Sequence, residues 1–219
     1  MNWLAIDTST ERATVAIAAN GMTYSDEQSN LRQHAQCLLA MIDGLLTQAA
    51  LTLNQLDGIV YGCGPGSFTG LRITCSVAKA LAYAHDLPLF PVTSLQTIAN
   101  EVFYQETTLD NSTGVLACLD ARMHELYWAY YEPKSKVIPE IRVSAASDIF
   151  VPSEASFVLA GVGLDPYIPQ LPADIQARAF HQRTIFPNAE AMIRLVQTGA
   201  IQAVSAAEAL PLYVRNQVT

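Results

Sequence analysis

The residues most able to do chemistry lie in a glycine-rich stretch, where four glycines and one proline fall between positions 62 and 70. An apolar run, 56–63, precedes it, and a helical pattern starts at Leu71. Backbone N–H groups at such a strand-to-helix turn can bind an anion, with help from the helix dipole. Ser67 or Thr69 is the predicted helix N-cap. A tight turn packed against its neighbours explains the stretch as well as a ligand site does.

The motif excludes two common phosphate sites. It lacks the Gly-Lys-Ser/Thr of a Walker loop, and its glycine spacing differs from that of a dinucleotide-binding fingerprint. A polar turn near the N-terminus could supply further phosphate contacts, or its side chains could simply bond their own backbone. The residues that would face a nucleotide are Asp7, Thr8, Ser9, Thr10, Gly64 and Gly66.

Other catalytic or metal-binding patterns are missing from the sequence. Local spacing gives no Ser-His-Asp set, no HExxH motif and no His/Cys cluster. Cys37, Cys63, Cys75 and Cys118 have neither metal-site nor redox-pair spacing, so reduced thiols in a cytoplasmic protein are the simplest interpretation. A dense polar cluster over 120–125 fits a solvated hairpin loop as well as a site. We therefore expect no catalytic residue, no metal and no tightly bound cofactor.

The composition of the chain limits the kinds of partner that it can bind directly. The 219 residues are 51% hydrophobic and 15% charged, which is typical of a folded globular chain. Its net charge of −8 makes it a poor nucleic-acid binder by itself, because phosphate neutralisation needs clustered Lys and Arg. No apolar run approaches the length of a membrane span, and the N-terminus has no basic region typical of a signal peptide.

The elements that must position these residues follow an α/β pattern. In the first half we predict strands at 4–7, 13–18, 23–28, 56–63 and 88–92, and helices at 31–50, 71–85 and 94–103. In the second half we predict strands at 115–120, 125–131, 137–143 and 156–163, a helical turn at 147–150, an irregular segment at 165–172, a helix at 188–198, a turn at 206–210 and an extended tail at 211–215.

Two similar halves are indicated by an internal repeat. Apolar strands at 4–7 and 117–120 both end in aspartate, turn, and return as a strand. A polar stretch, 107–114, separates the copies. The sequence therefore predicts a duplicated α/β fold with domains at 1–107 and 115–219.

The helix predicted over 31–50 is more apolar than one packed face requires. One stripe can rest on a sheet, whereas Leu39, Met41 and Leu46 extend the apolar surface round the helix. A neighbouring helix or a partner chain must cover this surplus. The predicted partner-interface residues come from this helix and the next one: Leu31, His34, Ala35, Leu38, Leu39, Ile42, Thr74, Val77, Ala78 and Leu81.

Four stretches together closely resemble the bacterial TsaB (YeaZ) family: 4–10, 64–72, 120–127 and 207–215. The resemblance implies two duplicated halves of the actin-like/Hsp70-like ATPase type (ASKHA, ribonuclease H-like). It also implies a role in forming N6-threonylcarbamoyladenosine at position 37 of tRNAs that read ANN codons. In that family the protein is a non-catalytic partner of the transferase TsaD, and TsaE is an ATPase that joins them.

The related TsaD family carries an HxxxH metal pair after its glycine motif. The aligned positions here are Ser94 and Ile98, which cannot replace imidazoles at a catalytic metal. We therefore expect a cytoplasmic scaffold that is a homodimer alone and a heterodimer with TsaD, touches tRNA only indirectly, and meets ATP or ADP only at a shared interface. Two alternatives are an ATP-dependent kinase or ATPase that uses Asp7 and Thr8, and a metallopeptidase-like enzyme.

Overall fold

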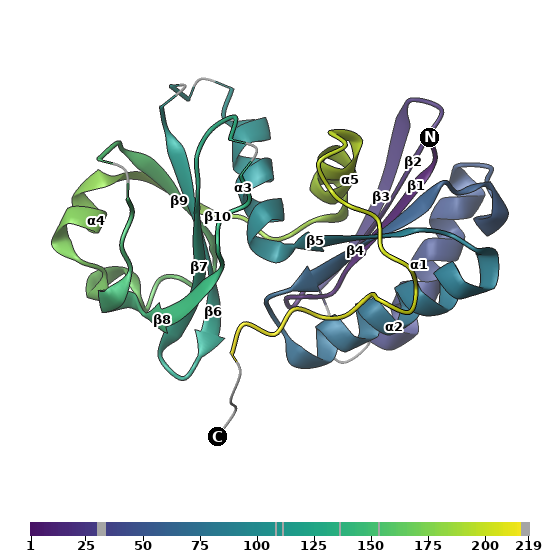
Figure 1. Cartoon of the computed structure of the whole chain (residues 1–219), viewed down its shortest axis with the longest axis horizontal. Helices are drawn as coiled ribbons and strands as arrows, with labels where there is room; N and C mark the ends of the chain where they lie inside the picture. Colours follow the sequence, from purple (N-terminus) through teal and green to yellow (C-terminus); the bar gives the residue numbers. More distant parts are fainter. Residues whose placement is uncertain (30–33, 108, 111, 136, 153, 216–219) are drawn as a thin grey trace. The chain divides into compact units, whose positions relative to one another are not determined.

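The chain forms two compact units. The computed structural model describes residues 1–219 except 30–33, 108, 111, 136, 153 and 216–219, and in helix α1 it leaves the side chains of 34–36 undescribed. Unit 1 consists of Met1–Thr97 with Pro187–Leu212, and unit 2 consists of Ile98–Phe186 with Tyr213–Thr219. Each unit is built on one five-stranded mixed sheet (Figure 1).

Unit 1 has the strand order β3-β2-β1-β4-β5. The first three strands pair antiparallel, and β4 and β5 extend the sheet in parallel with β1. The strands are β1 (Trp3–Asp7), β2 (Ala13–Ala19), β3 (Met22–Gln28), β4 (Gly58–Gly64) and β5 (Leu89–Thr93). The helices are α1 (His34–Gln48), η2 (Leu53–Gln55), α2 (Phe68–His85), the first turn of α3 (Ser94–Gln105), and α5 (Ala189–Gln197).

Alternating residues of β1 supply two separate apolar layers in unit 1. Leu4 and Ile6 belong to the core that α1 and α2 cover, whereas Trp3 and Ala5 belong to the core beneath α5. This alternation is the period of two of a β-strand. Figure 1 shows α1 and α2 on one face of the sheet and α5 on the other.

Unit 2 repeats the same topology, with strand order β10-β9-β6-β7-β8. The strands are β6 (Gly114–Arg122), β7 (Glu125–Tyr131), β8 (Arg142–Ala145), β9 (Phe157–Val162) and β10 (Ala179–Thr184). One face is covered by three short helices: η3 (Ala146–Asp148), η4 (Ile168–Gln170) and α4 (Ala173–Arg178). The rest of α3 lies on the opposite face (Figure 1).

The predicted duplication is confirmed by strand order and by local geometry. In both sheets the first strand pairs antiparallel with the second and parallel with the fourth. The two aspartates identified in the sequence also accept equivalent hydrogen bonds. Asp7 Oδ1 accepts the N–H of Ser9 at 2.8 Å, and Asp120 Oδ1 accepts the N–H of Arg122 at 2.7 Å.

The division between the units differs from the predicted boundaries at 107 and 115. Most of α3 groups with unit 2, and α5 returns to unit 1. The physical reason is that Met192, Ile193 and Val196 of α5 are buried against the second face of the unit 1 sheet. A single boundary in the sequence therefore cannot separate the two units.

Several predicted elements also need correction. The strand predicted at 137–143 is observed as β8, which starts only at Arg142. Neither α4 nor β10 was predicted, because α4 buries one residue, Ile175, and β10 has no alternating burial. Helix α2 starts at Phe68, three residues before the predicted start. The start of the helix predicted at 31–50 lies outside the described residues. Among the described helices, none has both the length and the apolar composition to cross a membrane.

We predict that α5 is required for the stability of unit 1. Met192 is fully buried, so Met192→Ala should lower the free energy of unfolding by about 2–5 kcal/mol through lost burial and a cavity. Gln197→Ala, at an exposed position in the same helix, should have almost no effect. Urea unfolding followed by circular dichroism measures both variants, and equal midpoints would contradict the assignment of α5 to this core.

Candidate functional site

The glycine-rich loop, residues 64–70, packs directly against the turn that follows β1. The Ser67 N–H donates to the Ser9 carbonyl oxygen at 2.7 Å. Thr8 Oγ1 donates to the Gly70 carbonyl oxygen at 2.7 Å, and it lies 2.6 Å from the Thr74 hydroxyl in a second hydrogen bond. The loop and the turn therefore form one hydrogen-bonded structure within unit 1.

Two of the loop glycines are required by close approach of the backbone. A Cβ on Gly70 would lie 1.8 Å from the Thr8 carbonyl oxygen, and a Cβ on Gly66 would lie 2.2 Å from that of Ser9. Cβ atoms essentially never approach another heavy atom within 3.0 Å. This geometry matches the packed-turn interpretation of the motif.

The residues predicted to face a nucleotide are brought together, but their own contacts bury them. Asp7 Oδ1 accepts hydrogen bonds from both the N–H and the hydroxyl of Ser9, at 2.8 and 2.7 Å. Asp7, Thr8, Ser9 and Thr10 are all buried. Gly64 is also enclosed, since a Cβ there would lie 2.9 Å from Leu71 Cδ1. Five of the six predicted residues are therefore buried in unit 1, and Gly66 is half-buried.

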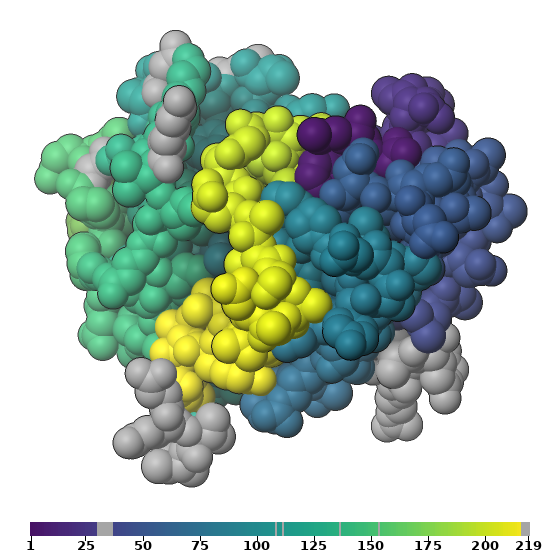
Figure 2. All heavy atoms as spheres, turned by 45° about the vertical axis from the view of Figure 1, so that its right-hand side comes forward, coloured from purple at the N-terminus to yellow at the C-terminus, as the bar shows by residue number. Residues whose placement is uncertain are grey.

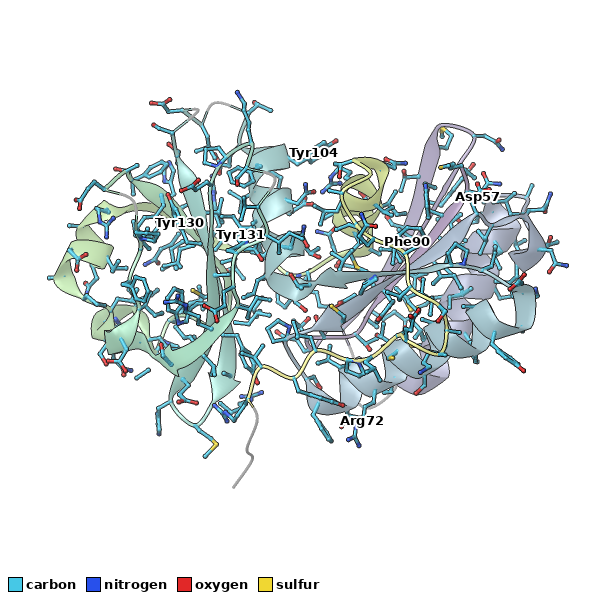
Figure 3. All side chains as sticks on the ribbon, viewed as in Figure 1. Asp57, Arg72, Phe90, Tyr104, Tyr130 and Tyr131 are labelled. Atoms are coloured by element: carbon cyan, nitrogen blue, oxygen red, sulfur yellow. The ribbon has the colours of Figure 1, made fainter. Side chains whose placement is uncertain are left out.

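The start of α2 is capped by a side chain of the loop. Ser67 Oγ accepts the N–H of Gly70 at 3.3 Å, which identifies Ser67 rather than Thr69 as the N-cap. One turn further on, the Arg72 guanidinium carbon lies 3.8 Å from the centre of the Phe68 ring. Figure 3 shows Arg72 directed away from the fold.

A C-terminal segment, residues 204–212, is hydrogen-bonded to β4 and α2, and we call it the strap. The Leu212 N–H donates to the Cys63 carbonyl oxygen at 2.7 Å, and Lys79 Nζ donates to the Ala209 carbonyl oxygen at 3.0 Å. The Tyr61 hydroxyl donates to the Leu210 carbonyl oxygen at 3.3 Å, and burial raises the pKa of Tyr61. Figure 2 shows the strap in yellow on the surface of unit 1. The sequence predicted a turn at 206–210 and an extended tail from 211, but not these contacts, because most of them use backbone carbonyl groups.

The predicted partner-interface residues divide into three groups. Leu31 lies outside the described residues, and the side chains of His34 and Ala35 are not described. Four others are buried in the core of unit 1 and offer no surface to a partner in this structure: Leu38, Ile42, Thr74 and Ala78. Three remain accessible: Leu39, Val77 and Leu81.

The surface of α1 and α2 is less apolar than the sequence suggested. Met41 and Leu46, which were predicted to need a second cover, are buried within unit 1. Exposed apolar groups nevertheless remain on both helices. Leu39 of α1 is 54% exposed and Tyr83 of α2 is 86% exposed. We call the accessible apolar positions of these helices the α1–α2 surface: Leu39, Ala40, Val77, Ala80, Leu81, Tyr83 and Ala84.

The polar cluster over 120–125 is assembled in unit 2. The Tyr167 hydroxyl donates to Asp120 Oδ1 at 2.7 Å, and burial together with this carboxylate raises the pKa of Tyr167 to about 12. Arg122 forms an ion pair with Asp120 at 3.2 Å, and Arg215 forms one with Glu125. Within the described residues, no group of three His, Cys, Asp or Glu side chains is arranged to hold a metal ion.

Comparison with known proteins identifies the family. Residues 27–193 match the family model described as "TsaD: tRNA N6-adenosine threonylcarbamoyltransferase". The chain is 34% identical to "tRNA threonylcarbamoyladenosine biosynthesis protein TsaB" of Haemophilus influenzae, over 99% of this chain and 94% of that protein. It is 32% identical to the Escherichia coli protein of the same name, over 100% and 96% of the two chains. The chain belongs to the TsaB family.

Solved structures confirm the TsaB fold. A structure titled "YeaZ from Pseudomonas aeruginosa" superposes with a TM-score of 0.87 at 32% identity, and the match covers 97% of this chain and 99% of that one. A second Pseudomonas aeruginosa structure, described as an uncharacterized protein with similarity to peptidase YEAZ, gives a TM-score of 0.89 at 32% identity over 98% and 99% of the chains. The α/β fold of two duplicated halves is therefore shared with these YeaZ structures.

We predict that the contact between the loop and the turn limits substitution in this chain. Gly70→Ala should lower the free energy of unfolding by about 1–3 kcal/mol or more, because the new methyl group meets the Thr8 carbonyl oxygen. Gly44→Ala is the control, since no heavy atom lies within 4 Å of its Cβ position. This helical position should gain about 0.5–1 kcal/mol. A Gly70→Ala variant as stable as wild type in thermal unfolding would refute the close contact.

A second prediction concerns alkaline pH. Burial and, secondarily, the Asp7 carboxylate raise the pKa of the Cys63 thiol from 9.0 to about 12. The unfolded thiol ionises first, so the stability linked to Cys63 is complete below about pH 9 and is lost as the pH rises toward 12. The midpoint of urea unfolding should therefore fall between about pH 9 and 11, and it should fall less in Cys63→Ala. If the unfolding midpoints of wild type and Cys63→Ala fall equally with pH, this thiol does not contribute to the pH dependence of stability.

Proposed function

We propose that this TsaB-family protein takes part in forming N6-threonylcarbamoyladenosine at position 37 of tRNAs that read ANN codons, as a non-catalytic partner of TsaD. Its full-length relatives are named as biosynthesis proteins of this modification. The family model that covers residues 27–193 describes the transferase itself. In this proposal the transferase chemistry belongs to TsaD, and the present chain supplies an interaction surface on a related fold.

The residues at the aligned metal positions support a role without catalysis. The sequence has no HxxxH motif, and Ser94 and Ile98 stand where the transferase family has its histidine pair. Both side chains are buried, Ser94 at the start of α3 and Ile98 one turn later. A hydroxyl and a buried hydrocarbon cannot hold a catalytic metal in place of two imidazoles. This argues against the metallopeptidase alternative.

The packing of the glycine loop against the turn after β1 supports this proposal over the kinase or ATPase alternative. Phosphates bind such loops through accessible backbone N–H groups. Here the Ser67 N–H is bonded to Ser9, and Thr8 is bonded to Gly70 and Thr74. In our proposal ATP or ADP therefore binds only at a surface shared with TsaD, and TsaE joins as the third component.

The observation that best supports a partner role is the α1–α2 surface. Leu39 and Tyr83 expose apolar groups on helices that already cover the sheet, so these side chains do not complete the core of unit 1. Exposed apolar groups indicate an interface where they gather into one patch, and we infer such a patch on these neighbouring helices. In isolation the chain would cover the surface by self-association, and TsaD would then compete for it.

We predict that Leu39→Glu abolishes both assemblies and leaves the monomer folded. Leu39 is 54% exposed, so a carboxylate there is solvated in the monomer but desolvated at an interface. Sedimentation or size-exclusion chromatography should show a monomer, and mixing with TsaD should give no heterodimer. Val137→Glu makes the same charge change at a 78% exposed apolar residue of unit 2, and it should leave both assemblies intact.

The modification level in cells completes the test. A strain that carries Leu39→Glu should lose N6-threonylcarbamoyladenosine in its tRNA, measured by mass spectrometry of nucleosides, although no reacting group was changed. A folded Leu39→Glu protein that still binds TsaD would show that the interface lies elsewhere. ATP hydrolysis at an enzyme-like rate by the isolated chain would instead favour the ATPase alternative.

A further inference from the structure

The hairpin between β6 and β7 contains a run of left-handed backbone conformations. Arg122, Met123 and His124 have φ values of +62°, +55° and +62°. Met123 and His124 are the two loop residues between the paired Arg122 and Glu125, and a type I′ hairpin turn requires a positive φ at both of them. Arg122 adds a third positive φ beside the register shift that follows Asp120, and this conformation is uncommon for a residue with a Cβ.

Contacts from three segments of unit 2 hold the hairpin. Asp120 accepts the backbone N–H of Arg122 at 2.7 Å, and the Tyr167 hydroxyl orients the same carboxylate at 2.7 Å. From the C-terminal tail, Arg215 pairs with Glu125, and its Nη1 donates to Met123 Sδ at 3.0 Å. The turn is therefore fixed on both sides.

Two of the three exposed side chains of this turn, Arg122 and His124, can donate hydrogen bonds, and the third is Met123. The Arg122 side chain is 86% exposed, and Asp120 takes only one of its two terminal nitrogens, at 3.2 Å. A guanidinium has five N–H donors in a planar fork that suits phosphate oxygens. His124 beside it is also exposed. The nearby carboxylates, Asp120 and Glu125, are each paired with an arginine.

The equivalent turn of unit 1 shows that the fold does not require this exposure. Thr8 and Ser9 occupy the same place after the first strand, yet they are buried against the glycine loop. In unit 2 the helix that follows the fourth strand is reduced to η4 and α4, and the hairpin side chains remain exposed. Duplication has thus produced one closed turn and one open turn.

We propose that the open turn, residues 122–124, is a recognition element that binds a backbone phosphate of the tRNA, and that Arg215 is the positioning residue that keeps it in shape. The proposal rests on the proposed function, which brings tRNA to this chain. It departs from the expectation of purely indirect contact with tRNA. The net charge of −8 makes the contact weak in the isolated chain, so it contributes mainly when TsaD holds the tRNA.

The test measures binding of a fluorescein-labelled, unmodified tRNA transcript by anisotropy, with the TsaD complex and with the chain alone at low salt. Arg122→Ala should weaken binding by about fivefold to thirtyfold and reduce the slope of log K against log salt by about 0.7–0.9. Arg142→Ala, which removes a 42% exposed arginine from the same unit, is the matched control and should change neither. Arg215→Ala should weaken binding and speed hydrogen exchange of the amides at 122–125, whereas Arg215→Lys should restore part of both.

The outcomes separate this proposal from the proposed function. If the wild-type chain assembles with TsaD but Arg122→Ala binds the transcript as tightly as Arg142→Ala, the phosphate contact is wrong and the partner role stands. If Arg122→Ala prevents assembly with TsaD, the turn is a protein contact and the proposal is overturned. If the wild-type chain forms no assembly with TsaD, the partner role fails. The phosphate contact is then tested with the isolated chains at low salt, where equal affinities of Arg122→Ala and Arg142→Ala for the transcript overturn it.

Discussion

The structure of unit 1 depends on how closely two backbone segments approach at the ends of β1 and β4. The Ser67–Ser9 hydrogen bond of 2.7 Å forms only because Gly66 and Gly70 have no Cβ. That approach fixes where α2 begins, and α2 in turn covers the sheet together with α1. The glycines of this motif are therefore explained by the close packing of two backbone segments.

Much of this fold could be predicted from the sequence because its signals are local. The aspartate that ends an apolar strand, found at Asp7 and Asp120, revealed the duplication, and the strand order confirms it. Long elements such as α1, α2 and β6 have strong periodicity, so their positions were close to those observed. Asn188 and Gly199 marked both ends of α5, where Asn188 Oδ1 accepts the N–H of Ala191 at 2.8 Å.

The remaining features depend on contacts between distant segments, which periodicity does not encode. Leu38 and Leu39 are neighbours in one apolar helix, yet one is buried and the other is 54% exposed, and only the placement of α2 and the sheet decides which. The hydrogen bonds between the strap and β4 use backbone carbonyl groups, so no residue type indicates them. The polar residues over 120–125 did indicate a hairpin loop, but not its three positive φ values. The short elements α4 and β10 were missed because they bury too few side chains to give a periodic pattern.

The return of α5 to unit 1 has a consequence for synthesis on the ribosome. Trp3, Ala5 and Val60 line a sheet face that is complete by residue 93, but the helix that covers it begins only at Ala189. At a translation rate of about 5–20 residues per second, this apolar face remains uncovered for about 5–20 s before α5 has been synthesised. Unit 2 is translated during that interval. The nascent chain therefore exposes a hydrophobic face that chaperones can bind, and every chain truncated before α5 keeps it exposed.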